Sequence, residues 1–320
     1  MTPISVVMPV YNTPVPILKE AVDSILNQTF RDYEFIIIDD GSKGDTAVYL
    51  DALNDPRIKL LRNEMNIGIT KSLNIGFRAA RGKYIARMDG DDISLKERLE
   101  KQYAYMESHS DVALCGCSIE DFGAKSRQYF TKLNDPEEYS IKSLFYYPGP
   151  LHPSFFIRSE TLKRYHISYN EELIYAQDYG LLVDISRCGG IIYNLPEVLL
   201  KRRYHEKRIS VQHSETQKRC SMKTQEKLLY ELLGNVTEEE MELHYRYFYN
   251  KNLRSFIDFC RCFQWCIKLS KANHWAGKYP KWKFDLYIFK LLVLVTGQSF
   301  LPKVAALLLS WRNAIFLRRN

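Results

Sequence analysis

The chain has 320 residues, of which 46% are hydrophobic and 26% charged, a composition that is typical of a folded protein and excludes an intrinsically disordered one. The net charge of +7 is uneven, because residues 1–200 carry 22 Lys and Arg against 28 Asp and Glu, whereas residues 201–320 carry 23 against 10. The basic last third predicts an anionic partner, namely phosphates, nucleic acid or an acidic membrane surface, with a solvated basic face as the alternative.

The N-terminus and the cysteines indicate the compartment. Residues 1–9 lack the basic start and the small-residue cleavage site of a signal peptide, and they read as a strand. The seven cysteines are odd in number and follow no framework spacing, which favours free thiols in a reducing compartment. We therefore expect a cytoplasmic protein.

Strands and helices alternate in the first part of the chain. Apolar runs predict strands over residues 4–9, 34–38, 58–62 and 84–88, and helical spacing predicts helices over residues 16–26 and about 70–80. Continuous apolar runs are expected for strands that are buried on both faces of a parallel sheet. The order predicts a doubly wound sheet with right-handed crossovers.

Polar residues follow each of these predicted strands. They are Tyr11-Asn12, Asp39-Asp40, Asn66 to Gly68, and Asp89 to Asp91. Because the carboxyl ends of parallel strands share one edge of the sheet, all four groups are expected at the edge where open α/β sheets bind ligands.

The turn Asp89-Gly90-Asp91-Asp92 places three carboxylates within four residues. Such crowding is relieved by a divalent cation, which can also bind phosphate oxygens, and the bland alternative is a solvated acidic turn. Ser94 to Glu97 reads as a capping box that opens a helix reaching about Ser108, and Val112 to Ser118 reads as a further strand.

Taken together, residues 7–12 (VMPVYN), 38–42 (IDDGS), 66–74 (NIGITKSLN) and 89–92 (DGDD) resemble family 2 inverting glycosyltransferases. The resemblance runs from about residue 3 to about residue 210. It implies the GT-A fold, a Rossmann-like, mostly parallel α/β sheet flanked by helices, here with a helical C-terminal appendage. We expect a catalytic domain over residues 1–214 and a basic helical region over residues 215–320. The chain contains neither a Walker A pattern nor Gly-x-Gly-x-x-Gly, which counts against a P-loop or dinucleotide site.

The resemblance implies a nucleotide-sugar pocket. Its expected residues are Pro9, Tyr11, Asn12, Asp39, Asp40, Arg62, Gly68, Lys71, Asp89, His152 and Arg203. Within the pocket, residues 9–12 lie against the base, Asp39 accepts a hydrogen bond from the base imide and Asp40 shapes the pocket. Arg62 and Lys71 stand near the nucleotide, and Asp89 reaches the ribose. Simple packing of Tyr11 is the alternative for that residue.

The resemblance also implies the catalytic and metal-binding residues. In the family a Glu-Asp pair opens a helix and its aspartate is the catalytic base; here Gln177 replaces the glutamate and Asp178 is kept. An inverting transfer needs one carboxylate to take the acceptor proton. The alternative is that Asp178 only stabilises the start of the helix. Asp91 and His205 are expected to bind Mn²⁺ or Mg²⁺, which acts as a Lewis acid on the diphosphate.

Two stretches complete the expected pocket. Residues 151–158 (LHPSFFIR) resemble the strand that lines the donor-sugar end, which makes His152 a pocket residue unless it is structural. Residues 201–210 (KRRYHEKRIS) resemble the family's Arg-x-His stretch that closes over the diphosphate, so Arg203 is expected to pair with phosphate. A basic loop without a role in the site is the alternative.

The C-terminal third reads as helical. Thr237 to Glu240 predicts a capping box, and a helix is expected over residues 252–272. Residues 284–295 are very apolar but shorter than a membrane span. With the tryptophans around them, residues 284–320 are expected to form either a peripheral membrane anchor or helices of the core or of a homo-oligomer.

The resemblance implies a metal-dependent hexosyltransferase, and we expect it to be cytoplasmic or peripheral on the inner face of the membrane. It would move a sugar from a nucleotide donor, a UDP-sugar, to a saccharide or lipid-linked saccharide in polysaccharide or glycan assembly, with no nucleic acid as partner. The alternatives are a transferase that charges polyprenyl phosphate from another nucleotide sugar, a sugar-phosphate nucleotidylyltransferase, and a non-catalytic nucleotide-sugar-binding or scaffold protein. The glycine-rich phosphate loop of the nucleotidylyltransferases is missing from this sequence.

Overall fold

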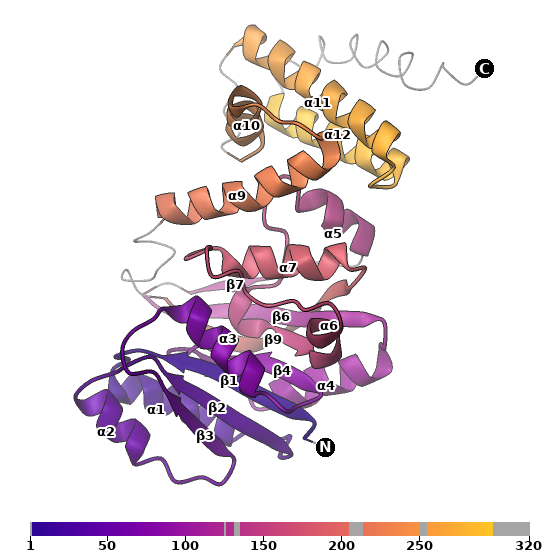
Figure 1. The fold of residues 1–320 in the computed structure, drawn as a ribbon. Coiled ribbons are helices and arrows are strands. Elements are labelled where there is room, and N and C mark those ends of the chain that lie inside the picture. Colours follow the sequence, from indigo (N-terminus) through magenta and orange to yellow (C-terminus); the bar gives the residue numbers. More distant parts are fainter. Residues whose placement is uncertain (1, 125, 131–134, 205–213, 250–254, 297–320) are drawn as a thin grey trace. The chain divides into compact units, whose positions relative to one another are not determined.

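The computed structural model describes residues 2–124, 126–130, 135–204, 214–249 and 255–296. The chain divides into two compact units, one formed by Met1–Tyr139 and Tyr147–Thr224 and the other by Ser140–Tyr146 and Gln225–Asn320. The first unit contains a sheet with helices packed on it, and the described part of the second unit is helical (Figure 1).

In the described part of the first unit, nine strands form one mixed sheet in the order β3-β2-β1-β4-β8-β6-β9-β5, with β7 paired to β6. The strands are β1 (Ile4–Val10), β2 (Tyr33–Asp39), β3 (Ile58–Arg62), β4 (Tyr84–Arg87), β5 (Ile93–Ser94), β6 (Val112–Gly123), β7 (Arg127–Tyr129), β8 (Phe156–Arg158) and β9 (Ile191–Tyr204). The first four are parallel to one another, as predicted, whereas β8 runs antiparallel to both β4 and β6.

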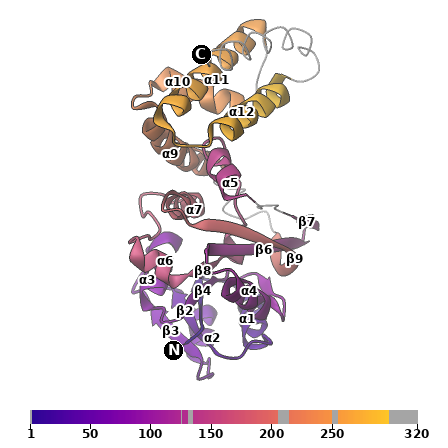
Figure 2. The same cartoon turned by 90° about the vertical axis from the view of Figure 1, so that its right-hand side faces the viewer.

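Helices cover both faces of this sheet. They are α1 (Val15–Leu26), α2 (Asp45–Asp51), α3 (Ile69–Ala79), α4 (Arg98–Ser108), α6 (Ser159–Arg164) and α7 (Gln177–Arg187). Because successive side chains of a strand point to opposite faces, Val6 packs in a core with Leu18 of α1 and Leu99 of α4, whereas Val7 packs in a second core with Leu73 of α3 and Leu182 of α7. Figure 2 shows α1 and α4 on one side of the sheet and α3, α6 and α7 on the other.

The start of α4 differs from the prediction. Ser94 does not open a helix by a capping box with Glu97; it lies in β5, paired with Leu200, and the helix begins at Arg98. The cap comes instead from Gln28, whose Oε1 accepts the Leu99 N–H at 3.0 Å while its Nε2 donates to Ser94 Oγ at 3.1 Å. A cap supplied from 71 positions earlier leaves no local pattern, so the capping-box prediction was wrong.

The order of the parallel strands positions the ligand-binding edge. β1 lies between β2 and β4, so the chain adds β2 and β3 on one side of β1 and then β4 on the other side, which makes the edge beside β1 a topological switch point. In open α/β sheets the crevice beyond the carboxyl ends of the strands at such a point is the usual ligand site. The four polar turns predicted at this edge follow β1, β2, β3 and β4.

The second unit contains the C-terminal part of α9 (Ser214–Leu233) from Gln225 onward, together with α10 (Glu238–His244), η2 (Tyr245–Tyr249), α11 (Phe256–Ala276) and α12 (Lys281–Thr296). α5 (Pro136–Lys142) begins in the first unit and ends in the second, and η1 (His152–Ser154) lies in the first. The capping box predicted at Thr237 and Glu240 is confirmed, because each of the two side chains accepts the backbone N–H of the other residue.

The apolar run over residues 284–295 mostly serves this unit's own core. Phe284, Ile288 and Leu292 are fully buried, whereas Leu286 and Leu294 are exposed. The predicted membrane anchor over residues 284–320 requires an apolar surface that faces the lipid, and α12 largely lacks one. Residues 297–320 of that predicted anchor lie outside the described residues. None of the described helices is both long and apolar enough for a membrane crossing.

Candidate active site

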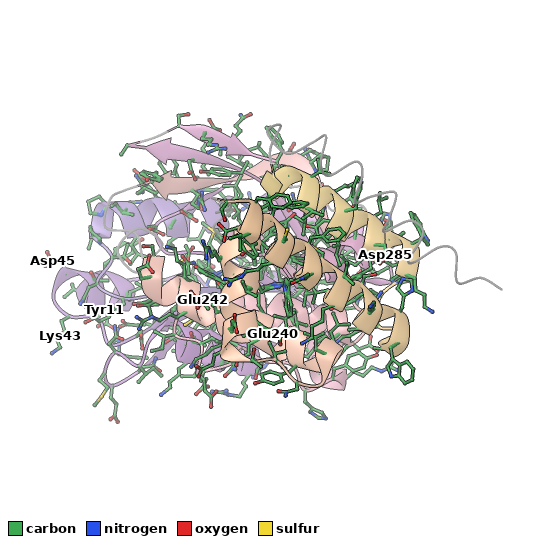
Figure 3. The ribbon with its side chains drawn as sticks, turned by 90° about the horizontal axis from the view of Figure 1, so that it is seen from above. Tyr11, Lys43, Asp45, Glu240, Glu242 and Asp285 are labelled. Carbon is green, nitrogen blue, oxygen red and sulfur yellow. The ribbon has the colours of Figure 1, made fainter. Side chains whose placement is uncertain are left out.

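The loops after β1 and β2 are tied together by Asn12. Its backbone N–H donates to Ser42 Oγ at 3.0 Å, and its Oδ1 accepts the Lys43 N–H at 2.9 Å. Asn12 adopts a φ of 46°, a left-handed conformation that asparagine tolerates better than most residues. Tyr11 remains half exposed beside the loop that carries Lys43 and Asp45, so part of its side chain is accessible to a ligand (Figure 3).

Asp39 and Asp40, both buried, organise the ends of β2 and β3. Asp39 accepts the Ser42 N–H at 2.8 Å and an Nε–H of Arg62 at 2.8 Å. This hydrogen bond is the largest influence that raises the pKa of the Arg62 guanidinium, which also pairs with Asp51. A carboxylate has lone pairs for further donors, so these contacts orient Asp39 without exhausting its capacity to accept.

Asp40 holds the loop before α3. Its Oδ1 accepts from Asn63 Nδ2 at 2.8 Å and from the Ile67 N–H at 3.0 Å, and its Oδ2 accepts the Gly68 N–H at 2.9 Å. Gly68 has a φ of +92°, which favours glycine, and directly precedes α3. Lys71 lies exposed in the first turn of that helix, so this loop is fixed while its cation faces solvent.

The acidic turn brings three carboxylates to one point. Ligand oxygens of Asp89, Asp91 and Asp92 lie within 4.8 Å of one another. The turn also abuts β1, because a Cβ at Gly90 would lie 3.3 Å from Val10 Cγ2 and 3.5 Å from the Pro9 carbonyl oxygen. The half-buried Pro9 and the predicted ribose and metal residues are therefore neighbours.

Asp92 is the buried member of the acidic turn. Burial, followed by the charges of Asp89 and Asp91, raises its pKa well above the usual range. Its Oδ1 accepts the Arg203 N–H at 2.9 Å, but among the described residues its buried Oδ2 has no hydrogen-bond partner. An orphaned carboxylate oxygen beside two further carboxylates is the donor set that hard divalent cations prefer, so these residues fit a Mg²⁺ or Mn²⁺ ion.

Arg87, the last residue of β4, is a site residue that the sequence reading missed. It is buried, and its Nη2 pairs with Asp89 Oδ1 at 2.5 Å. Burial is the largest influence and lowers the pKa of this guanidinium, but the neighbouring acids outweigh it, so the net pKa is raised and Arg87 stays charged. Its Nε and Nη1 have no hydrogen-bond partner among the described residues. The sequence did contain a signal for this role, because Arg87 is the only charged residue of the otherwise uncharged strand β4 and three aspartates follow it within five residues.

Replacing Arg87 with Met is expected to lower the free energy of unfolding by up to about 3 kcal/mol, because the carboxylate of Asp89, which is 28% exposed, loses its buried partner. Urea denaturation measures the change. Lys19→Met is the matched control, since it removes an ion pair with Asp23 in which both side chains are exposed, and little change is expected. Equal losses in the two variants would contradict a structural role for the Arg87 pair.

Asp178 opens α7, as predicted, and sits close enough to the acidic turn to interact with it electrostatically. Burial is the largest influence on its carboxyl group and raises its pKa, while its own hydrogen bond from the Tyr179 N–H and the Arg87 charge lower it. The Asp89 charge raises it further. Asp178 as a residue is half-buried, and its ionised carboxylate is a stronger proton acceptor than that of an ordinary aspartate.

His152 faces the same region from η1. Its Nε2 lies 2.7 Å from the hydroxyl of the buried Tyr169. Burial and then the Arg87 charge lower the pKa of His152 well below its usual value, so its imidazole is neutral at physiological pH. A neutral imidazole next to a charged guanidinium is suited to hydrogen bonding and not to binding a phosphate by charge.

The end of β9 closes over the acidic turn. Arg203 donates through Nε to the Asp91 carbonyl at 3.0 Å, pairs through Nη2 with Glu20, and lies over the Phe122 ring at 4.5 Å. The side chain predicted to bind phosphate thus fixes the turn that carries the predicted metal ligand. His205, the second predicted metal ligand, lies outside the described residues.

Known proteins resemble this chain in sequence and in fold. A family model described as glycosyl transferase family 2 matches residues 5–174. An uncharacterized glycosyltransferase of Haemophilus influenzae is 32% identical, with 69% of this chain and 71% of the relative covered. The amylovoran biosynthesis glycosyltransferase AmsE of Erwinia amylovora is 31% identical, with 62% and 75% covered. The crystal structure of S. aureus TarS 1-349 in complex with UDP-GlcNAc gives a TM-score of 0.60 at 17% identity, with 88% of this chain and 89% of that chain covered.

Proposed function

We propose a reaction for this chain, which belongs to glycosyltransferase family 2 and has the GT-A fold. The chain transfers a sugar from a UDP-sugar to a hydroxyl group of a saccharide or lipid-linked saccharide, and the configuration at the anomeric carbon is inverted. The observation that carries this proposal is the placement of Asp178, a carboxyl group of raised pKa, beside an acidic turn that fits a divalent cation.

Each loop at the crevice has a part in binding the donor. Tyr11 offers a half-exposed side chain for the base, and Asp39 retains acceptor capacity for the base imide. Asp89 is held by Arg87 next to Pro9, where the ribose would lie against β1. Asp91, with Asp92 and the predicted ligand His205, would hold the cation, which supplies Lewis-acid stabilisation to the leaving diphosphate when it is bound.

Asp178 takes the proton from the acceptor hydroxyl as that oxygen attacks the anomeric carbon. A general base works best when its pKa approaches the operating pH, and burial moves Asp178 in that direction. The base must be ionised, so transfer is lost as the pH falls through the raised pKa of Asp178. As a neutral group, His152 would accept or donate a hydrogen bond at the sugar without adding a second cation to that of Arg87.

Several features support the wider role. AmsE acts, by its name, in amylovoran biosynthesis, and the TarS structure holds UDP-GlcNAc, which supports a UDP-sugar donor and a role in polysaccharide assembly here. All seven cysteines are free thiols, which supports a reducing compartment. We assign donor binding and transfer to residues 1–214, and the helical region over residues 215–320 to contacts outside the reaction.

A thermal-shift panel with UDP-, GDP- and CMP-sugars tests the donor. In the presence of Mn²⁺, a UDP-sugar at 100 times its dissociation constant is expected to stabilise the fold by about 2.7 kcal/mol, with smaller shifts for the other two classes. UDP without its sugar serves as the control for recognition of the nucleotide alone. A larger shift with a GDP- or CMP-sugar would reassign the donor, and no shift with any of them would contradict nucleotide-sugar binding.

A further inference from the structure

Two tryptophans are exposed where α11 turns into α12. Trp275, near the end of α11, is 95% exposed, and Trp282, in the first turn of α12, is 64% exposed. Tyr279, an aromatic between them in the sequence, is only 6% exposed and stacks on Phe284 with ring centroids 5.2 Å apart. The fold therefore separates these aromatics, keeping one inside and presenting two to solvent.

Residues 275–283, here called the tryptophan turn, are fixed by contacts with α11 and α9. The buried Asn273 donates from Nδ2 to the Tyr279 carbonyl at 3.1 Å and accepts the Tyr279 N–H through Oδ1 at 2.8 Å. Gly277 ends α11 with a φ of +63°, and its N–H donates to the Asn273 carbonyl. Lys278 pairs with Glu231 of α9. The tryptophans thus project from a fixed scaffold, so their exposure is built into the fold.

The surroundings of the tryptophan turn are basic. Residues 271–283 contain four lysines and no acidic residue. Lys271 and Lys281 are exposed and have no carboxylate partner among the described residues, and Lys283 lies 5.7 Å from the centre of the Trp282 ring. The nearest acid in the chain, Asp285, is turned inward, where it accepts from Ser270 at 2.6 Å and contacts His274 at 2.7 Å. Figure 3 labels Asp285 on α12.

We propose that the tryptophan turn docks this protein on the surface of a bilayer that contains anionic lipid. Tryptophan favours the boundary between headgroups and acyl chains, where its ring is buried and its N–H stays hydrated. Lysines near an anionic leaflet add attraction that falls off within a Debye length. This docking does not depend on the proposed transfer reaction.

Co-sedimentation of the full chain with vesicles tests the proposal. Binding is expected to vesicles of phosphatidylglycerol and phosphatidylcholine, and to weaken in high salt or with phosphatidylcholine alone. The double variant Trp275→Ala and Trp282→Ala is expected to lose about tenfold or more in partitioning, a factor equivalent to about 1.4 kcal/mol. Tyr165→Ala is the matched control, because Tyr165 is an exposed aromatic of the first unit with a neighbouring arginine.

A second readout guards against misfolding of the double variant. Trp275→Phe and Trp282→Phe, made singly, keep an aromatic ring, and quenching of the remaining tryptophans by brominated lipid is expected to fall with each. The proposal is overturned if the double variant, with an unchanged melting temperature, partitions like the parent, or if bromine quenching is the same in all variants. It is also overturned if light scattering shows the double variant to be a monomer and the parent a dimer, with no vesicle binding by either.

Discussion

Replacing Asp178 with Asn is expected to lower kcat by about 10²–10⁴-fold while the affinity for the donor stays within about twofold of the parent, the range being that of lost general-base catalysis. Asparagine keeps the shape of the side chain and an oxygen that can accept the Tyr179 N–H, which donates at 2.9 Å in the parent. It cannot take a proton from the acceptor, so the loss falls on the chemical step. Initial rates with saturating donor, together with donor titration, measure the two effects.

The same substitution is expected to raise the melting temperature at neutral pH. Burial raises the pKa of Asp178 in the folded protein above its value in the unfolded chain, so the protonated form is favoured by folding. The stability that the group contributes is complete below the unfolded pKa and is lost as the pH rises through the folded pKa. The neutral asparagine avoids that loss, so a gain in stability accompanies the loss of activity.

Asp184→Asn is the matched control, because Asp184 lies on the same helix and pairs at the surface with Arg187. It is expected to leave kcat and the melting temperature close to those of the parent. If Asp178→Asn retains the parent kcat, Asp178 is not the base. If both variants lose kcat equally, the effect belongs to the helix and not to the carboxylate.

Replacing Asp91 with Ala is expected to weaken Mn²⁺-dependent donor binding by on the order of 100-fold, since even outer-shell changes at metal sites cost 10–100-fold. Asp91 is the predicted metal ligand in the acidic turn. Without it Asp89 still pairs with Arg87, and only Asp92 Oδ2 and the predicted ligand His205 are left to hold the ion. Donor binding measured in EDTA is expected to be nearly unchanged. A titration with Mn²⁺ alone, in which electron paramagnetic resonance measures the concentration of the free ion, gives the affinity of the metal site without any turnover.

Asp111→Ala, which removes an exposed carboxylate just before β6, is the control for a general loss of negative charge. It is expected to keep the donor affinity and the Mn²⁺ titration of the parent. Equal donor binding by Asp91→Ala in Mn²⁺ and in EDTA, at the affinity of the parent, would reject the metal role of Asp91.

Much of the first unit was predictable because its information is local. Apolar runs marked β1 to β4, and helical spacing marked α1 and α3 to within about two residues. The polar turns could be assigned to one edge because parallel strands leave no other choice once their direction is known. The strands β5, β7 and β9 were not predicted, because two are very short and the third carries charged residues where it pairs with β6 beyond Glu120.

The candidate site was predictable only in its loops. Asp39, Asp40 and the acidic turn carry motifs in consecutive residues, and the structure brings them to one edge. Arg87 and Asp92 were missed as site residues, because their importance comes from burial and from partners that the sequence does not display. Whether an acid is orphaned, as Asp92 Oδ2 is, depends on every chain segment packed around it.

By itself, the sequence determined the family, the alternation of strands and helices, and the residue types available at the edge of the sheet, because these depend on short-range pattern. The tertiary structure decided the rest: that Gln28 caps α4, that Arg203 from the last strand fixes the acidic turn, and that Tyr279 is buried while Trp275 is exposed. The first two outcomes depend on contacts between residues that are distant in the sequence. The third depends on which aromatic side chains the core covers. No local pattern encodes these features.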